Sequence, residues 1–237
     1  MIKRLPFSLS ALFLAFSFLI GSCGRSVEGT GSIVNKKLEL SEFRSIELEI
    51  PVKVTIAMSD SIQGVIRAQN NIAELIELKY DGDELIIKSK EDYNTSLPVE
   101  LVLSARVLEK LIINGSGEII VINPVRGNEL RLEINGSGDI AVQTNVEKLR
   151  TNINGSGDVS IEGKAVTHRV RMNGSGNVLA GSLQTEVTDI HINGSGDADV
   201  TANTSLEAKV MGSGNVTYQG SPKVDVDITG SGEVSKK

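Results

Sequence analysis

Five cationic side chains recur at a regular distance from a repeated Gly-Ser-Gly triplet in the second half of this sequence. Each stands five residues before a triplet, except the last, which stands three before; they are Lys110, Arg131, Arg150, Arg169 and Arg171. The five-before column then changes sign and continues with Asp189, Glu207 and Asp225. If equivalent positions stack, a basic stripe runs into an acidic one on a single face. One hypothesis is that the basic stripe docks an acidic glycan, or another copy's acidic stripe in a homo-oligomer; the sequence favours the alternative over it.

The alternative for this stripe is a solvated face with no ligand. Oppositely charged neighbours such as Arg131 and Glu133 would then form exposed ion pairs, each contributing well under ~1 kcal/mol.

A second column follows the triplets with the carboxylates of Glu118, Asp139 and Asp158. Carboxylates stacked ~4.8 Å apart repel one another by about 1 kcal/mol, so a shared Ca²⁺ would relieve them. Calcium-binding rolls, however, repeat a Gly-rich turn every nine or so residues, and the opposite corners of this repeat lack one. We therefore predict no metal and no cofactor, and we expect the Asp and Asn side chains to favour the turn.

The sequence predicts no catalytic set. His168 lies in an otherwise apolar column and His191 faces outward, and neither has a nucleophile or paired carboxylate at a fixed offset. A pectinase-like polysaccharide lyase or hydrolase is the less favoured alternative, because the chain has few aromatic side chains and short repeat loops. Lys and Arg are dispersed and the net charge is −6, so nucleic acid is not an expected partner.

The triplets themselves define the elements that would position these side chains. They begin at Gly115, Gly136, Gly155, Gly174, Gly194, Gly212 and Gly230, at intervals of 18 to 21 residues. Apolar and polar residues alternate on both sides of each triplet, which indicates strands with one buried face. We predict an all-β, single-stranded parallel β-helix of three short strands per coil, with the right-handed sense that parallel crossovers prefer.

The turns are predicted to depend on glycine and asparagine, because a sharp corner requires backbone conformations that these residues adopt at low cost. The residues assigned to this structural role are Asn135, Gly136, Gly138, Asn154, Gly155, Gly157, Gly174, Gly176, Gly194 and Gly196. The asparagines are also expected to stack in a hydrogen-bonded ladder from coil to coil.

Residues 33–107 are predicted to be irregular coils that cap the GSG repeats of 108–237. Their alignment places Ile46 over Leu111 and Val54 over Ile119, and matches the segment 80–83 to 113–116.

The N-terminus has the pattern of a lipoprotein signal at residues 1–22. An apolar run leads to Ile-Gly-Ser-Cys, so Cys23 is the predicted site of lipid attachment, followed by a tether over 23–32. The predicted location is the cell envelope, anchored to the outer membrane by lipid.

The lipobox, the irregular first half and the Asn-Gly-Ser-Gly repeats together resemble the bacterial envelope family named putative auto-transporter adhesin, head GIN domain. The resemblance covers essentially the whole mature chain and implies a β-helical, secreted or outer-membrane-anchored protein. It implies no catalytic residues. We therefore expect a noncatalytic surface protein that binds a glycan or protein, with a purely structural or regulatory envelope role as the alternative.

Overall fold

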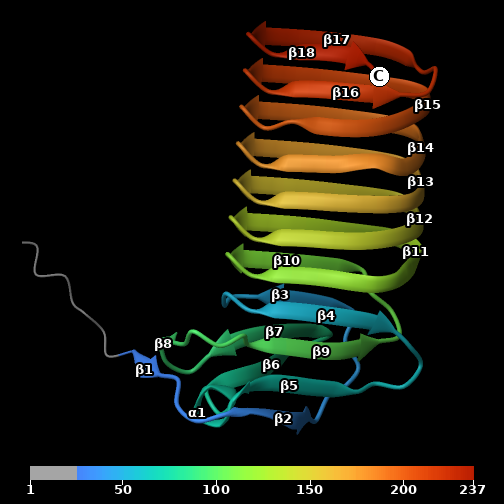
Figure 1. Ribbon diagram of the computed structural model, residues 1–237. Coiled ribbons are helices and arrows are strands. Elements are labelled where there is room, and N and C mark those ends of the chain that lie inside the picture. Colours follow the sequence, from blue (N-terminus) through green and yellow to red (C-terminus); the bar gives the residue numbers. More distant parts are fainter. Residues whose placement is uncertain (1–25) are drawn as a thin grey trace, which may run out of the picture.

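The computed structural model describes residues 26–237 as a stack of parallel β-coils standing on an irregular base (Figure 1). About 72% of these described residues are in strands and 2% in a helix, arranged as a β-solenoid of about seven turns. The one helix among residues 26–237 is α1 (Asn70–Ala73), which is too short to cross a membrane. The predicted all-β parallel β-helix is therefore confirmed.

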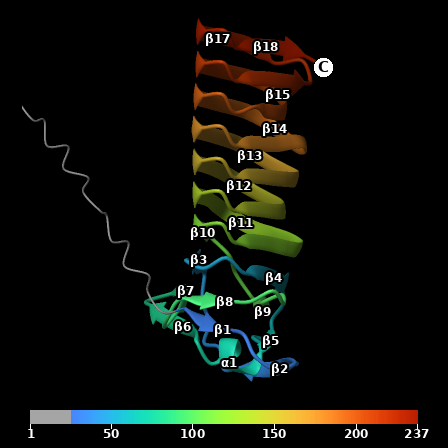
Figure 2. The same cartoon turned by 60° about the vertical axis from the view of Figure 1, so that its left-hand side comes forward.

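The upper part of the molecule consists of strands that pair in parallel in the order of the sequence. These strands are β10 (Lys110–Gly115), β11 (Glu118–Gly136), β12 (Asp139–Gly155), β13 (Asp158–Gly174), β14 (Asn177–Gly194), β15 (Ala198–Gly212), β16 (Asn215–Gln219), β17 (Lys223–Gly230) and β18 (Glu233–Lys236). Figure 2 shows the coils from a second side, stacked in register.

Each full coil differs from the expected three short strands. From β11 to β15 the chain is one continuous strand between successive GSG turns, and it bends halfway. The bends coincide with shifts in register, for example between Val121 and Val125 and between Ser160 and Gly163. Backbone pairing resumes directly after each shift, so a coil needs only one sharp corner.

The inward column before the first six triplets forms the centre of the core, whereas Ile228, before the last triplet, is 38% exposed. Ile113, Ile134, Ile153, Met172, Ile192 and Val210 are all at most 1% exposed. Each such side chain contributes about 1.5 to 3 kcal/mol on burial, so two or more of them per coil outweigh the cost of the two glycines of its turn, about 1 to 2 kcal/mol.

The GSG corners require glycine for two separate reasons. The first glycine of every triplet has a positive φ, between 131° and 144°, as the sequence predicted. In addition, from the second triplet onward a Cβ on either glycine would collide with a glycine carbonyl oxygen of the preceding coil, as at Gly155 and Gly157. The coils approach this closely because each serine amide donates to that carbonyl, for example Ser175 N to Gly155 O at 2.9 Å.

The first coil of the base sits where the alignment placed it. Strand β3 (Ser45–Leu48) pairs with β10 so that Ile46 lies over Leu111, and β4 (Lys53–Met58) pairs with β11 so that Val54 lies over Ile119. Below this coil lie β7 (Glu84–Ser89) and β9 (Glu100–Ala105), also in parallel. The chain therefore returns past the β3–β4 coil before it starts the repeats.

Most of the rest of the base consists of antiparallel pairs rather than coils. Strands β6 (Ile76–Asp81) and β7 form a hairpin, and β5 (Gly64–Gln69) pairs antiparallel with β2 (Ile33–Leu38) and β9. The expected match of residues 80–83 to a GSG turn is thus wrong. Gly82 has a positive φ of 61°, but it serves a two-residue hairpin turn, which resembles the GSG corner only in its need for glycine.

The segment before β2 also contacts the base. Strand β1 (Val27–Glu28) pairs in parallel with β8 (Tyr93–Asn94), and the Asn71 amide donates to the Glu28 carbonyl at 2.7 Å. These contacts fall within residues 23–32, where the sequence predicted a tether.

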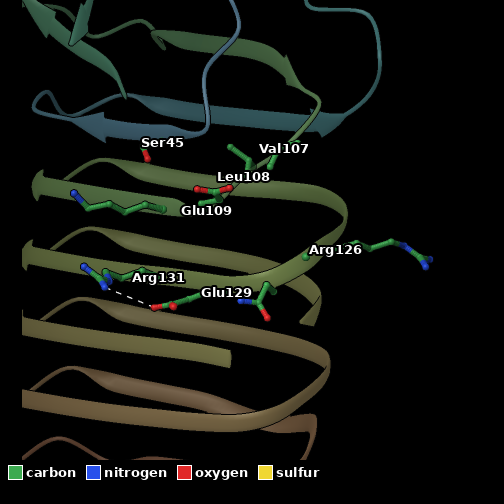
Figure 3. A pocket seen from close by; sticks show the side chains of 10 residues that line it. Ser45, Val107, Leu108, Glu109, Arg126, Glu129 and Arg131 are labelled. Atoms are coloured by element: carbon green, nitrogen blue, oxygen red, sulfur yellow. Dashed lines mark ion pairs between the residues drawn. The ribbon is translucent and has the colours of Figure 1, made fainter. Parts of the chain in front are cut away.

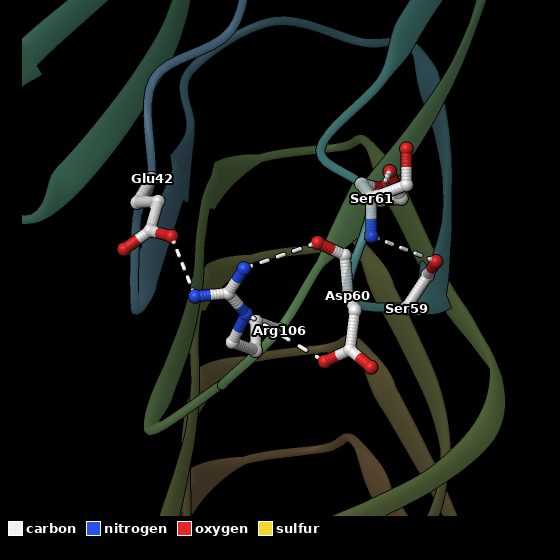
Figure 4. A network of polar contacts seen from close by, with 6 residues as sticks. Glu42, Ser59, Asp60, Ser61 and Arg106 are labelled. Carbon is white, nitrogen blue, oxygen red and sulfur yellow. Dashed lines mark hydrogen bonds and ion pairs between the residues drawn. The ribbon is translucent and has the colours of Figure 1, made fainter.

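Arg106, at the return from β9 towards β10, joins two connections of the base (Figure 4). Its guanidinium donates to Glu42 Oε1 at 2.8 Å and to the Asp60 carbonyl at 3.2 Å. The segments after β2 and β4 are thereby held where the chain enters the repeats.

Candidate functional site

The basic stripe is continuous in the structure. Lys110, Arg131, Arg150 and Arg169 are direct partners on four successive strands, and Asp189 follows on the next. Arg171 lies two residues further along β13, in the adjacent outward column, where its partner is His191. Strand pairing thus brings together side chains that are 19 to 21 residues apart in the sequence.

The stripe's cations have carboxylate neighbours at its surface. Lys110 lies 3.3 Å from Glu84, and Arg169 lies 2.9 Å from Asp189. The Glu129 carboxylate is shared by Arg131 at 3.6 Å and Arg150 at 3.0 Å.

The expected partner of Arg131, Glu133, instead accepts a hydrogen bond from Asn135 at 3.0 Å. Because the paired side chains of the stripe are 23% to 50% exposed, each pair contributes at most about 1 kcal/mol. A ligand could exchange these partners at small cost.

A groove of about 400 Å³ lies at the foot of the stripe, between the returning chain and the first bend of the repeats (Figure 3). Residues 107–110 line one side and residues 126–129 the other, with Arg131 beside them. The volume falls within the range of about 300 to 1,000 Å³ of ligand sites. Sequence periodicity missed this groove because residues 107–109 precede the first strand of the repeats, β10, and reach the groove only through the topology of the base.

The acidic column has a structural use in the turns. The Asp139 carboxylate accepts a hydrogen bond from the Asp158 amide at 3.0 Å, and Asp158 accepts in turn from the Asn177 amide at 2.9 Å. Glu118 instead pairs with Lys53 at 3.1 Å. These partners offset the repulsion between the stacked carboxylates. No group of three or more potential metal ligands occurs within residues 26–237.

The asparagine ladder forms as predicted over four coils. Asn135 donates to Asn114 at 3.0 Å, Asn154 donates to Asn135 at 2.9 Å, and Asn173 donates to Asn154 at 2.9 Å. Each amide in the middle of the ladder therefore both donates and accepts. The ladder links consecutive turns along the same edge as the GSG corners.

His168 belongs to the core and not to a surface site. It is 1% exposed, and its Nε2 lies 3.0 Å from the hydroxyl of Thr151 in the coil below. Burial lowers the pKa of His168 to about 3, so the ring is neutral at physiological pH. Above the histidine, the hydroxyl groups of Thr185 and Thr188 lie 2.7 Å apart and are also buried. A substrate therefore reaches neither the histidine nor these threonines.

Cys23 and the predicted signal lie outside the residues that the structure describes, which begin at residue 26.

The chain matches one protein family over most of its length. The model of the family described as "putative auto-transporter adhesin, head GIN domain" matches residues 42–222. A search of curated proteins gives no significant match.

Several solved structures share the fold. A putative adhesin from Bacteroides fragilis NCTC 9343 is 22% identical with a TM-score of 0.84, covering 90% of this chain and 100% of its own. A putative lipid binding protein from Parabacteroides distasonis ATCC 8503 is 21% identical with a TM-score of 0.75, over 90% and 100%. A putative adhesin from Parabacteroides merdae ATCC 43184 is 21% identical with a TM-score of 0.73, over 90% and 99%. At these identities the likeness shows the fold alone.

Proposed function

Because the chain belongs to the head GIN domain family of putative auto-transporter adhesins, we propose that it is a noncatalytic adhesion protein of the cell envelope. Its ligand is an acidic glycan or an acidic protein surface, and its recognition face is the basic stripe. The observation that carries this proposal is the unbroken register of four cations from Lys110 to Arg169, with the 400 Å³ groove at its foot.

The solenoid supports this function because it fixes the spacing of the cations. Adjacent coils hold them ~4.8 Å apart, and continuous backbone pairing keeps that spacing over the whole stripe. Several cations can therefore contact a repeating anionic polymer or an acidic strand edge at once. Because the backbone that holds them is already ordered, binding does not pay the entropic cost of ordering the protein. Binding of this kind requires no catalytic group.

We place the protein at the outer membrane through a lipid on Cys23. The basic start, the apolar run and the Ile-Gly-Ser-Cys sequence support this location. Replacing Cys23 with Ser should abolish acylation and release the protein from the membrane fraction. Continued partitioning of C23S into membranes would contradict a lipid anchor.

The direct test of the stripe is a double substitution, Arg131→Gln with Arg150→Gln, measured against an array of envelope glycans, host glycans and matrix proteins. Both arginines contact Glu129, so glutamine removes charge while leaving a side chain that can hydrogen-bond to it. The matched control is Lys36→Gln with Lys37→Gln, on the exposed part of β2, which causes the same change in net charge.

We expect saturable binding by the wild type and by the control, and loss of binding by the stripe variant. Increasing ionic strength should weaken the binding, because exposed charges are screened over about 8 to 10 Å in physiological salt. Equal binding by the stripe variant and the control would rule out the stripe as the recognition face. Absence of binding by folded wild-type protein would favour a structural envelope role.

A further inference from the structure

A second groove, of about 260 Å³, lies on the outer face of the upper coils and is formed by β13, β14, β15 and β17. The side chains that matter there are Arg171, Asn173, His191, Asn193, Lys209 and Met211. We propose that this groove binds one carboxylated sugar, a uronic acid residue. The inference rests on the proposed adhesive function and names a ligand class for it.

Arg171 provides the cation for the carboxylate. Within residues 26–237, Arg131, Arg150 and Arg169 each have a carboxylate within 4.0 Å, whereas no carboxylate lies that close to Arg171. Arginine presents planar pairs of N–H groups that match a carboxylate in a bidentate geometry. Among the arginines of the stripe and its neighbouring column, Arg171 is thus the one whose charge is available without breaking an ion pair.

His191 holds the Arg171 guanidinium in place. Arg171 Nη1 lies 3.2 Å from His191 Nδ1, and because a guanidinium can only donate, Nδ1 accepts and the ring hydrogen is on Nε2. Nε2 in turn lies 3.3 Å from Asp189 Oδ1, without forming a hydrogen bond to it. The contact with His191 fixes one of the guanidinium donors and leaves the others for a ligand.

The end of the asparagine ladder supplies amides for the hydroxyl groups of a sugar. Asn173 uses its amide nitrogen to reach Asn154, which leaves its Oδ1 as an acceptor. Asn193 follows it in register on β14, and no hydrogen bond of its side chain is found in the described part of the chain. Both residues are exposed in the groove.

Met211 ends the asparagine column and gives the groove an apolar surface. It pairs with Asn193 in register and is 57% exposed. An exposed thioether side chain beside free amides suits a sugar ring, which presents C–H groups on its face and hydroxyl groups at its edge. A simple inorganic anion would make no use of this surface.

The charges in the groove fix the direction of the bound sugar. Lys209 is paired with Glu207 at 2.8 Å, and Asp227 lies at the far end of the groove. A carboxylate is therefore attracted to Arg171 and repelled near Asp227. Along the solenoid axis, two coil steps, about 10 Å, separate the strands of Arg171 and Met211. The volume of the groove lies slightly below ~300 Å³, the lower end of the range of ligand sites, so the groove accommodates one sugar unit.

The test measures binding of glucuronic acid, glucose and acetate to the full chain by NMR titration or calorimetry. Glucuronic acid combines carboxylate and ring, and the other two probes carry one feature each. We expect it to bind at least about tenfold more tightly than either. Arg171→Gln should weaken its binding by about tenfold or more, and Met211→Asn should weaken it while extending the ladder.

Lys164→Gln is the matched control, because Lys164 is also an exposed cation of β13 and has no carboxylate within 4.0 Å in the described chain, but lines neither groove. It should leave glucuronic acid binding unchanged. The inference is overturned if folded wild-type protein does not saturate with glucuronic acid, if acetate binds as tightly, or if K164Q and R171Q have equal effects. Failure of the proposed function is distinguishable from failure of this inference. If the basic stripe is not the recognition face, the Arg131→Gln/Arg150→Gln variant binds the glycan and protein array as the wild type does.

Discussion

Four single substitutions of glycine by alanine separate the two reasons that the GSG corners need glycine. Gly115 has a φ of 131° but no atom within 4 Å of an added Cβ, and Gly157 would place a Cβ closer than 3.0 Å to the Gly138 carbonyl and to Ile134. Gly155 combines a φ of 140° with a collision against the Gly136 carbonyl. Gly127 has neither feature and is the control.

The structure sets the expected order of stability. A residue forced to positive φ costs about 1 to 3 kcal/mol, and overpacking costs a further 1 to 3 kcal/mol or so. Gly115→Ala and Gly157→Ala should therefore each lower the free energy of unfolding by about 1 to 3 kcal/mol, and Gly155→Ala by about 2 to 6 kcal/mol. Gly127→Ala should be neutral or raise it by up to about 1 kcal/mol, because alanine restricts the unfolded chain.

The assay is urea denaturation followed by circular dichroism for the wild type and the four variants. The losses for Gly155→Ala are large compared with the total stability of about 5 to 15 kcal/mol typical of domains, so they are readily measured. If Gly157→Ala is as stable as Gly127→Ala, close approach of the coils does not limit this position. If Gly115→Ala lowers the free energy of unfolding as much as Gly155→Ala, positive φ alone explains why glycine recurs at the turns.

Two further predictions concern the ladder and the buried histidine. Asn154→Ala removes one donated and one accepted hydrogen bond and should lower the free energy of unfolding by about 1 to 2 kcal/mol. The control Asn145→Ala, at an exposed position on the bend, should change the free energy of unfolding little. Equal losses for the two variants in urea denaturation would argue against the ladder. The pKa of His168 is about 3 in the folded chain and about 6.5 when unfolded, so the unfolded state alone binds a proton between these values. As the pH falls below 6.5, the free energy of unfolding of the wild type should therefore decrease by roughly 1.4 kcal/mol per pH unit relative to that of His168→Leu. The same dependence of the free energy of unfolding on pH in both proteins would contradict this prediction.

The repeats were predictable from the sequence because each coil uses the same local rule. Alternation marked the inward residues, and a single period placed Ile46 over Leu111 and Arg131 over Arg150. The collision of a Cβ at Gly157 with the preceding coil was not predictable, because the distance between these coils is set by backbone hydrogen bonds between residues 20 positions apart, such as Ser156 N to Gly136 O.

The base followed the repeat pattern only in part. Parallel and antiparallel strands share the same alternation, so the strand pattern of residues 76–89 could not distinguish a hairpin from a coil. The signal that could have found the hairpin is the two-residue turn Gly82-Asp83 between the two apolar runs. The pairing of Arg171 with His191 likewise depends on side chains from two coils. The stripe's columns could thus be predicted, but the choice of ion-pair partners, and with it the available charge on Arg171, required the structure.

The most direct test of noncatalytic adhesion measures both the binding of an acidic polysaccharide to the protein and the size of that polysaccharide afterwards. Purified chain is titrated with a polyuronate, bound polymer is measured, and the size of the polymer is then determined by size-exclusion chromatography after prolonged incubation. A noncatalytic adhesive solenoid predicts saturable, salt-sensitive binding and an unchanged polymer size. Shortened polymer would show catalysis and contradict the account, and folded protein without any binding would contradict its choice of ligand.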